Sequence, residues 1–210
     1  MNWIEMENWP RKRHFDMFQR VDMPHFSITA DVEVTQSLAF CKQRNISSST
    51  LMLYLISRTA NEIENMLYRI RADKVCIHTS VDPAFTVLAD DELYYHCRVR
   101  YQKDFLAFCE DVKAQSALAK QDKTLHTEKQ DDVIYLSCLP WVAFTGNSHA
   151  MHFSPVDSVP RYYWGKYHQR DGKMMMPFSV QVHHGLADGL HVGRQFDAMQ
   201  RYLSEPESIL

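Results

Sequence analysis

Strand-like and helix-like apolar patterns are interspersed along this chain, without a steady alternation of one strand and one helix. Over residues 25–34 every second residue is apolar, from Phe26 to Val34, which is typical of a strand with one buried face. The serines at 47–49 can cap a following helix, in which apolar residues recur every three or four positions. The mixture of patterns predicts an α+β fold, a mixed β-sheet sandwich with flanking helices.

The remaining elements follow from the same two periodicities. An Asp-Gly pair between two strand-like runs predicts a tight turn at Asp171 and Gly172. The most polar segment, residues 121–132, is expected to be a solvated loop. Further strands are expected at residues 67–71, 75–78, 85–88, 94–101, 133–137, 142–145, 161–168 and 173–184, and further helices from Thr35, over 103–119 and from Asp188 and Gly189 onward.

Length and composition narrow the class of protein. A chain of 210 residues predicts one domain, spanning residues 1–210, with a sizeable core. Lys and Arg number 23 against 26 Asp and Glu, so the chain lacks the basic excess of a nucleic-acid binder. Five scattered cysteines predict reduced thiols and a cytoplasmic location. We expect neither a secretory signal nor a membrane span, because no long apolar run occurs.

The sharpest local feature is residues 182–189 (VHHGLADG), where a predicted strand gives way to a predicted helix. Catalytic residues concentrate in loops at strand ends, and histidine is the side chain best able to exchange a proton near neutral pH. A lone histidine on a strand is more often a satisfied core residue, but the His183-His184 pair followed by Asp188-Gly189 favours a functional site. The spacing of His184, Asp188 and His191 also leaves a divalent metal site open, although two glycines within it argue against one continuous helix.

The same motif resembles the signature of the CoA-dependent acyltransferases, and within them the chloramphenicol acetyltransferase family. The resemblance extends over residues 181–194 (QVHHGLADGLHVGR) and reappears in family order along nearly the whole chain. The other matching stretches are residues 8–15 (NWPRKRHF), 80–87 (SVDPAFTV), 137–142 (SCLPWV) and 166–167 (KY).

This resemblance implies a mechanism and its residues. His184 matches the general base that takes a proton from an acceptor hydroxyl, and Ser137 matches the hydroxyl that stabilises the oxyanion formed from acetyl-CoA. Asp188 and Arg11 match a structural ion pair. The resemblance further implies acetyl-CoA as co-substrate, no metal, a small-molecule hydroxyl acceptor and a homotrimer with active sites between subunits. It places Tyr167, Lys166 and Trp141 near CoA.

The acceptor pocket departs from the family more than the mechanism does. Aromatic or polar side chains stand where the family has smaller, more apolar or different ones, so chloramphenicol is less secure as an acceptor than acetyl transfer is as a reaction. The pocket positions are Phe18, Tyr95, Tyr135, Asn147, His149 and Tyr163.

Two other functions remain open at this stage. The altered pocket would also fit a catalytically silent protein that binds CoA or another ligand. The presence of His184 and Ser137 argues against that alternative. The acyltransferase core of a 2-oxoacid dehydrogenase complex shares the motif, but the chain lacks a lipoyl domain and an Ala- and Pro-rich linker.

Overall fold

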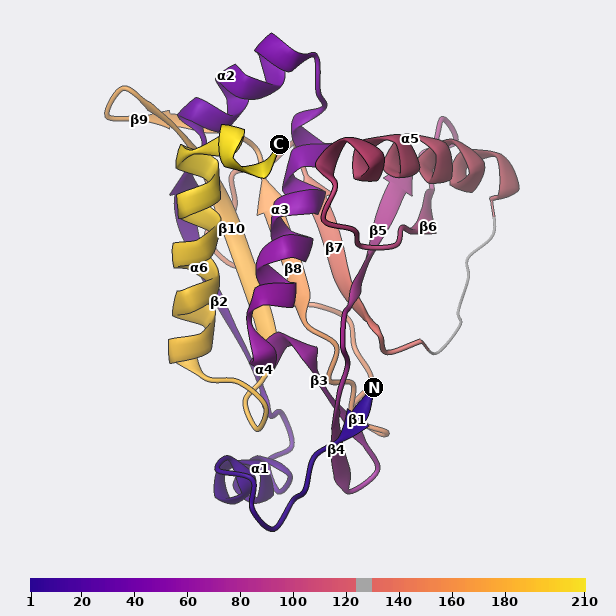
Figure 1. Ribbon diagram of the computed structural model, residues 1–210, viewed down its shortest axis with the longest axis vertical. Coiled ribbons are helices and arrows are strands. Elements are labelled where there is room, and N and C mark those ends of the chain that lie inside the picture. Colours follow the sequence, from indigo (N-terminus) through magenta and orange to yellow (C-terminus); the bar gives the residue numbers. More distant parts are fainter. Residues whose placement is uncertain (124–129) are drawn as a thin grey trace.

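The computed structural model describes residues 1–123 and 130–210. Within them, seven strands form one mixed sheet in the order β2-β10-β8-β7-β5-β6, with β9 paired to β10, and three short strands form a second sheet in the order β1-β4-β3. The helices α2, α3, α5 and α6 lie on one side of the large sheet, and α1 lies beyond its lower end (Figure 1). This arrangement confirms the predicted α+β class with a mixed sheet and flanking helices.

The strands are β1 (Asn2–Trp3), β2 (His25–Glu33), β3 (Tyr68–Arg71), β4 (Lys74–Ile77), β5 (Asp82–Leu88), β6 (Tyr94–Arg98), β7 (Val133–Leu139), β8 (Arg161–Gly165), β9 (His168–Arg170) and β10 (Lys173–His183). The helices are α1 (Lys12–Phe18), α2 (Thr35–Arg44), α3 (Ser48–Glu62), α4 (Glu64–Leu67), α5 (Phe105–Asp122), α6 (Gly189–Ser204) and the 3₁₀ turn η1 (Pro206–Ile209).

Strand β10 organises the sheet, because it pairs with three others. It runs antiparallel to β2 over nine residue pairs and antiparallel to β8 and β9. Strands β8, β7 and β5 are parallel to one another, and β6 closes the far edge antiparallel to β5. Most of β10 is buried, as its continuous apolar run requires of a strand covered on both faces.

The two faces of the sheet differ in chemistry. Leu136, Tyr162 and Val180 are cross-strand neighbours, and all three are buried in the core under the helices. The residue adjacent to each of them, which follows on β7 and β8 and precedes on β10, points to the opposite face, and there Ser137, Tyr163 and Ser179 are neighbours. The apolar face holds the fold together, while the polar face is free to do chemistry.

Helix α3 shows why the helical face is stable. Ser47 accepts a hydrogen bond from the backbone N–H of Thr50, so the predicted cap is confirmed. The stripe at three- and four-residue spacing, which includes Met52, Leu55 and Ile56, lies fully buried against the sheet. Burial of that stripe supplies most of the stability of such a helix.

The Asp171-Gly172 turn is also confirmed. Both residues have positive φ, 52° and 77°, and they connect the paired residues Arg170 and Lys173. A two-residue hairpin loop with positive φ at both positions matches the twist of its strands, which explains the Asp-Gly sequence.

Several predictions need correction. Residues 142–145 are irregular and do not form a strand. The Val142 N–H donates to Leu139 O at 3.4 Å across a turn at Pro140 and Trp141, and Pro140, which has no N–H, ends the β7 ladder. The expected strand over 161–168 is divided into β8 and β9. The predicted loop over 121–132 is partly helical, since α5 continues to Asp122, and its residues 124–129 lie outside the described part.

Strand β1 and helix α1 were not expected, because neither has a clear apolar period. Helix α1 is fixed instead by Phe15, which packs edge-on against Trp9 in a small cluster separate from the main core. No helix in the described residues is long and apolar enough to cross a membrane.

Candidate active site

The turn that follows β10 carries His184, and backbone hydrogen bonds fix it. The His184 N–H donates to Pro24 O at 2.7 Å, and the Gly185 N–H donates to Nδ1 of His183 at 3.1 Å. A Cβ at Gly185 would lie 3.0 Å from the His183 ring and 3.4 Å from Cα of Phe15. The glycine therefore allows the turn to pack against both neighbours.

Two aromatic rings hold the imidazole of His184. Phe18, the last residue of α1, stacks on it at 4.1 Å between ring centroids, and the Phe26 ring is 4.5 Å away. Nδ1 of His184 is buried and has no hydrogen-bond partner among the described residues. The ring is thus oriented by packing, and no described residue forms a hydrogen bond with its nitrogens.

Arg11 clamps the same turn through three hydrogen bonds. Its guanidinium donates to His184 O at 3.1 Å, to Gly185 O at 3.3 Å and to Asp188 Oδ2 at 2.8 Å. Asp188 in turn caps α6 by accepting from the Leu190 N–H. Burial opposes ionisation of Asp188, but Arg11, His191 and the Leu190 N–H together outweigh it, so the pKa of the carboxyl lies below its ordinary value.

His183, the other histidine of the pair, points into the protein. It is 2% exposed, and burial lowers its pKa to about 3, so the ring is neutral and accepts at Nδ1. The His25 ring lies edge-on against it at 5.0 Å, and Nε2 of His25 donates to Asp157 O at 2.7 Å. Burial lowers the pKa of His25 as well. These two histidines belong to the support of the turn.

Ser137 lies in the middle of β7, on the face away from the helices. Its hydroxyl is 3.2 Å from the Thr86 hydroxyl. The register places Ser137 beside Tyr163, which pairs with Ser179 of β10. His184 lies five residues beyond Ser179, about 16 Å along the strand and about 10 Å across two strand spacings from Ser137. One chain therefore does not bring His184 and Ser137 together.

The residues expected in the acceptor pocket fall into three places. Phe18 lies against His184. Tyr135, Tyr163, Asn147 and His149 lie on or over the polar face near Ser137, and the His149 ring packs edge-on against Tyr163 at 4.3 Å. Tyr95 lies in register with Val87 and shares the helix-covered face with Cys97 and Phe85, so it is separated from Ser137 by the sheet.

The residues expected near CoA lie on neighbouring segments. The Lys166 N–H donates to Val142 O at 2.9 Å, which holds the turn carrying Trp141 beside Lys166 and Tyr167. Trp141 is 66% exposed, and Lys166 is exposed too, while burial raises the pKa of Tyr167. An exposed indole and an exposed ammonium can meet a nucleotide from solvent.

The geometry does not favour the metal alternative for this motif. Helix α6 begins at Gly189, so His184 is in the preceding turn, and the Asp188 carboxylate is engaged by Arg11, the cap and His191. Elsewhere in the described residues, Cys76, His78 and Asp131 have ligand atoms within 4.8 Å of one another. Arg71 binds both oxygens of Asp131, which leaves that carboxylate committed.

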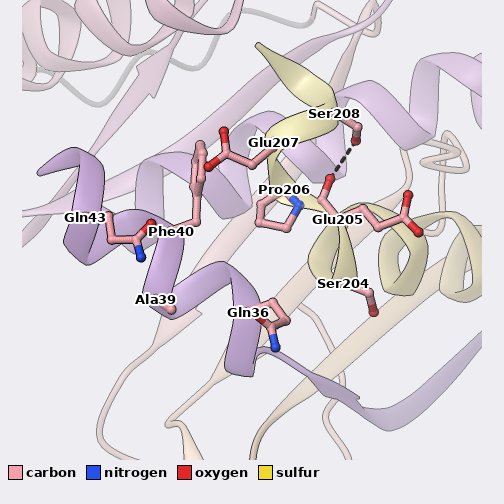
Figure 2. A pocket seen from close by; sticks show the side chains of 9 residues that line it. All are labelled: Gln36, Ala39, Phe40, Gln43, Ser204, Glu205, Pro206, Glu207 and Ser208. Atoms are coloured by element: carbon pink, nitrogen blue, oxygen red, sulfur yellow. Dashed lines mark hydrogen bonds between the residues drawn. The ribbon is translucent and has the colours of Figure 1, made fainter.

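Two surface hollows in the described residues lie away from all of these groups. One, of 470 Å³, lies between α2 and η1, and its polar lining comes from both elements (Figure 2). The other, of 910 Å³, lies between α3, α5 and the C-terminus. Neither is lined by any residue of the predicted site, so neither hollow holds the predicted chemistry.

Sequence reasoning missed three supports of the His184 turn: Pro24, Phe26 and Asn65. Asn65 Nδ2 donates to Leu186 O at 2.8 Å, and Pro24 and Phe26 act through the β2–β10 pairing. The only available signal was that residues 25–34 and 173–184 were both predicted strands, which does not show that they pair.

Comparison with known proteins gives one consistent answer. The model of the family described as chloramphenicol acetyltransferase matches residues 1–200. A chloramphenicol acetyltransferase of Clostridium perfringens is 30% identical over 100% of this chain and 97% of that protein. Chloramphenicol acetyltransferase 3 of Escherichia coli is 28% identical over 94% of each chain.

Solved structures agree. One chloramphenicol acetyltransferase superposes with a TM-score of 0.86 at 26% identity, covering 95% of this chain and 98% of that one. A dihydrolipoamide acetyltransferase of Azotobacter vinelandii, at 16% identity and a TM-score of 0.73, covers 94% of this chain and 88% of that one and shares the fold. The fold is thus that of the CoA-dependent acyltransferases. Within that class the chain belongs to the chloramphenicol acetyltransferase family, and it is an acyltransferase.

Proposed function

We propose that this protein is a single-domain, cytoplasmic enzyme that transfers the acetyl group of acetyl-CoA to a hydroxyl of a small acceptor. Chloramphenicol is the first acceptor to test, because the relatives are named for it. The observation that carries the proposal is His184, held in a clamped turn between two aromatic rings with its side chain free to exchange a proton.

The proposed reaction needs both substrates bound at once. His184 removes the proton of the acceptor hydroxyl, whose oxygen attacks the thioester carbonyl carbon. The Ser137 hydroxyl donates a hydrogen bond to the oxyanion of the tetrahedral intermediate. When the intermediate collapses, the C–S bond breaks, the ester forms and the CoA thiolate takes the proton from the imidazolium. No acetyl-enzyme is required, because positioning two bound reactants lowers the barrier.

We further propose that two copies of the chain complete each active site, within a homotrimer. The separation of His184 and Ser137 along and across the sheet supports this, because reacting groups must approach to about 3–3.5 Å. Trp141, Lys166 and Tyr167 are proposed to contact CoA, and no step calls for a metal.

The test follows free thiol in a mixture of protein, acetyl-CoA and chloramphenicol. We expect thiol release that depends on both substrates, with the acetylated acceptor found by mass spectrometry and no acetylated protein. Light scattering should give three times the mass of one chain. Acetyl-CoA binding without thiol release, across chloramphenicol and a panel of alcohols and amines, would instead favour the catalytically silent ligand-binding protein.

A further inference from the structure

The polar face around Ser137 carries a dense set of hydrogen-bonding groups. Cross-strand pairing places Thr86, Ser137, Tyr163 and Ser179 in one row on the face away from the helices. Tyr135 lies two residues before Ser137 and therefore on the same face. A molecule bound at the Ser137 hydroxyl meets these side chains, with Leu139 as the aliphatic neighbour two residues further along β7.

The segment that crosses this face adds to its polarity. Asn147 accepts from the Ser179 hydroxyl at 2.5 Å, and its Nδ2 lies 3.0 Å from Nε2 of His149. The His149 ring is packed against Tyr163. Since Nδ2 of Asn147 can only donate, Nε2 of His149 accepts, and its proton is on Nδ1. The amide, the imidazole and the phenol thus form one ordered cluster.

The one strong charge nearby is neutralised. The guanidinium of Arg161 binds Asp157 Oδ2 at 2.6 Å, and both side chains are largely buried. Its carbon also lies 5.2 Å from the centroid of the Tyr135 ring. Burial and then Arg161 lower the pKa of His149 to about 4, so that ring is uncharged at neutral pH. Around Tyr135, Tyr163 and His149 the described residues therefore present dipoles and rings, and the Arg161 charge among them is paired.

Both phenol hydroxyls on this face are available. Tyr135 and Tyr163 make ring contacts, and no described residue hydrogen-bonds to either phenol oxygen. Two phenol rings beside hydroxyl, amide and imidazole groups suit a ligand with apolar C–H groups and many polar substituents. An acceptor lacking such substituents would leave the two phenol hydroxyls without hydrogen-bond partners.

We propose that the acceptor is a neutral, polyhydroxylated molecule of the carbohydrate type, bound against Tyr163 and Tyr135 and hydrogen-bonded by His149 and Asn147. This inference rests on the proposed acetyl transfer, and it names the class of molecule that supplies the hydroxyl. It assigns these residues to acceptor selection, while the proton transfer stays with His184.

The experiment compares acceptors in the full-length protein. Thiol release is measured with methyl glycosides of glucose, galactose and mannose and with chloramphenicol, and kcat/KM is compared for each. We expect the best glycoside to exceed chloramphenicol by about tenfold or more, because a site built to hydrogen-bond a substrate discriminates strongly.

Variants that keep the aromatic ring then test whether the preference for glycosides depends on Tyr163 and His149. Tyr163→Phe and His149→Phe keep an aromatic ring and remove the polar atoms, so the ratio of kcat/KM for the best glycoside to kcat/KM for chloramphenicol should fall by about tenfold or more. The matched control is Tyr202→Phe, because Tyr202 is on α6, across the sheet, where its hydroxyl donates to Glu62 at 2.6 Å. Circular dichroism melting shows that each variant is folded.

The results of these experiments distinguish failure of the acceptor class from failure of the proposed acetyl transfer. Thiol release that requires His184 but favours chloramphenicol over every glycoside overturns the acceptor class and leaves acetyl transfer intact. A glycoside preference that neither Tyr163→Phe nor His149→Phe changes overturns the assignment to these residues. Absence of His184-dependent release with every acceptor overturns the proposed function, and the inference with it.

Discussion

The turn that carries His184 and the polar face around Ser137 are built in opposite ways. The turn is a short continuous segment whose backbone is held by Arg11, Pro24 and His183. The polar face combines single side chains from β5, β7, β8 and β10, brought together by strand register, and from the crossing segment, held there by the Asn147–Ser179 hydrogen bond. A continuous clamped segment suits a proton transfer that needs one fixed geometry. On a surface assembled from separate side chains, each residue can be substituted without disturbing the others. Such a surface suits acceptor binding, because single substitutions can change which acceptor is bound.

The largest effect is expected at His184, in the turn. His184→Ala should lower kcat about 10³- to 10⁴-fold with every acceptor, because a positioned general base contributes a factor of that order. The measurement is thiol release at saturating acetyl-CoA, with Phe18→Leu as a variant that removes only the stacked ring. An unchanged rate in His184→Ala would remove the base from this turn.

Ser137 should have the next largest effect. Ser137→Ala is expected to lower kcat about 10²- to 10³-fold, as loss of one oxyanion donor does elsewhere. Refolding an equal mixture of His184→Ala and Ser137→Ala chains should restore part of the activity, because some sites would then pair an intact His184 with an intact Ser137. No recovery in the mixture, at an unchanged oligomeric mass, would contradict a site shared between copies.

Acid should weaken the protein through its buried histidines. The pKa of His183 is lowered to about 3 and that of His149 to about 4, while an unfolded histidine titrates near 6.5. Between these values the unfolded state binds more protons, so stability is lost as pH falls below about 6.5. For His183 alone the loss by pH 5 is about 2 kcal/mol.

Melting temperatures between pH 7.5 and 4.5 measure this loss. His183→Asn keeps an acceptor for the Gly185 N–H without the titration, so its melting temperature should fall less over the same range. Identical pH dependence in both proteins would show that His183 contributes nothing to it.

The Arg11 clamp should have a smaller effect on stability. Arg11→Ala removes three hydrogen bonds from the turn, but Asp188 stays partly exposed, so we expect a loss of about 1–2 kcal/mol of unfolding free energy. Activity should fall with it because the turn loosens. Urea unfolding checks the first effect and thiol release the second, with Lys12→Ala, whose partner is an exposed Asp16, as the neighbouring control. A variant as stable as the original chain would mean that the clamp is not structural.

The smallest effect is expected at Tyr95. Tyr95→Phe removes a hydroxyl that donates to Asp91 on the helix-covered face, so the ranking of acceptors should not change. Tyr163→Phe, the same chemical change on the polar face, should change it. A shift in acceptor preference in Tyr95→Phe would place that side chain in the pocket despite the sheet between them.

Much of the fold could be predicted from local pattern. The alternation over residues 25–34, the stripe in α3 and the Asp-Gly turn each follow from a period of two, a period of 3.6 or a positive φ. Residues 142–145 show the limit of such patterns, because these four apolar or β-favouring residues are irregular and follow a turn at Pro140 and Trp141. Strand β1 and helix α1 show the same limit, since long-range packing of Trp9 and Phe15 fixes that region and leaves no period in the sequence.

The sequence by itself determined the class of chemistry. The elements of the His184 motif are adjacent in the chain, so the strand end, the tight turn and the helix cap could all be recognised from one short segment. Only the tertiary structure decided which pocket residues share a face. Strand register separated Tyr95 from Ser137 and placed Tyr163 beside it, and side-chain contacts brought Asn147 and His149 onto the same face. Register depends on pairing between distant strands, and a shift of one residue would exchange the two faces.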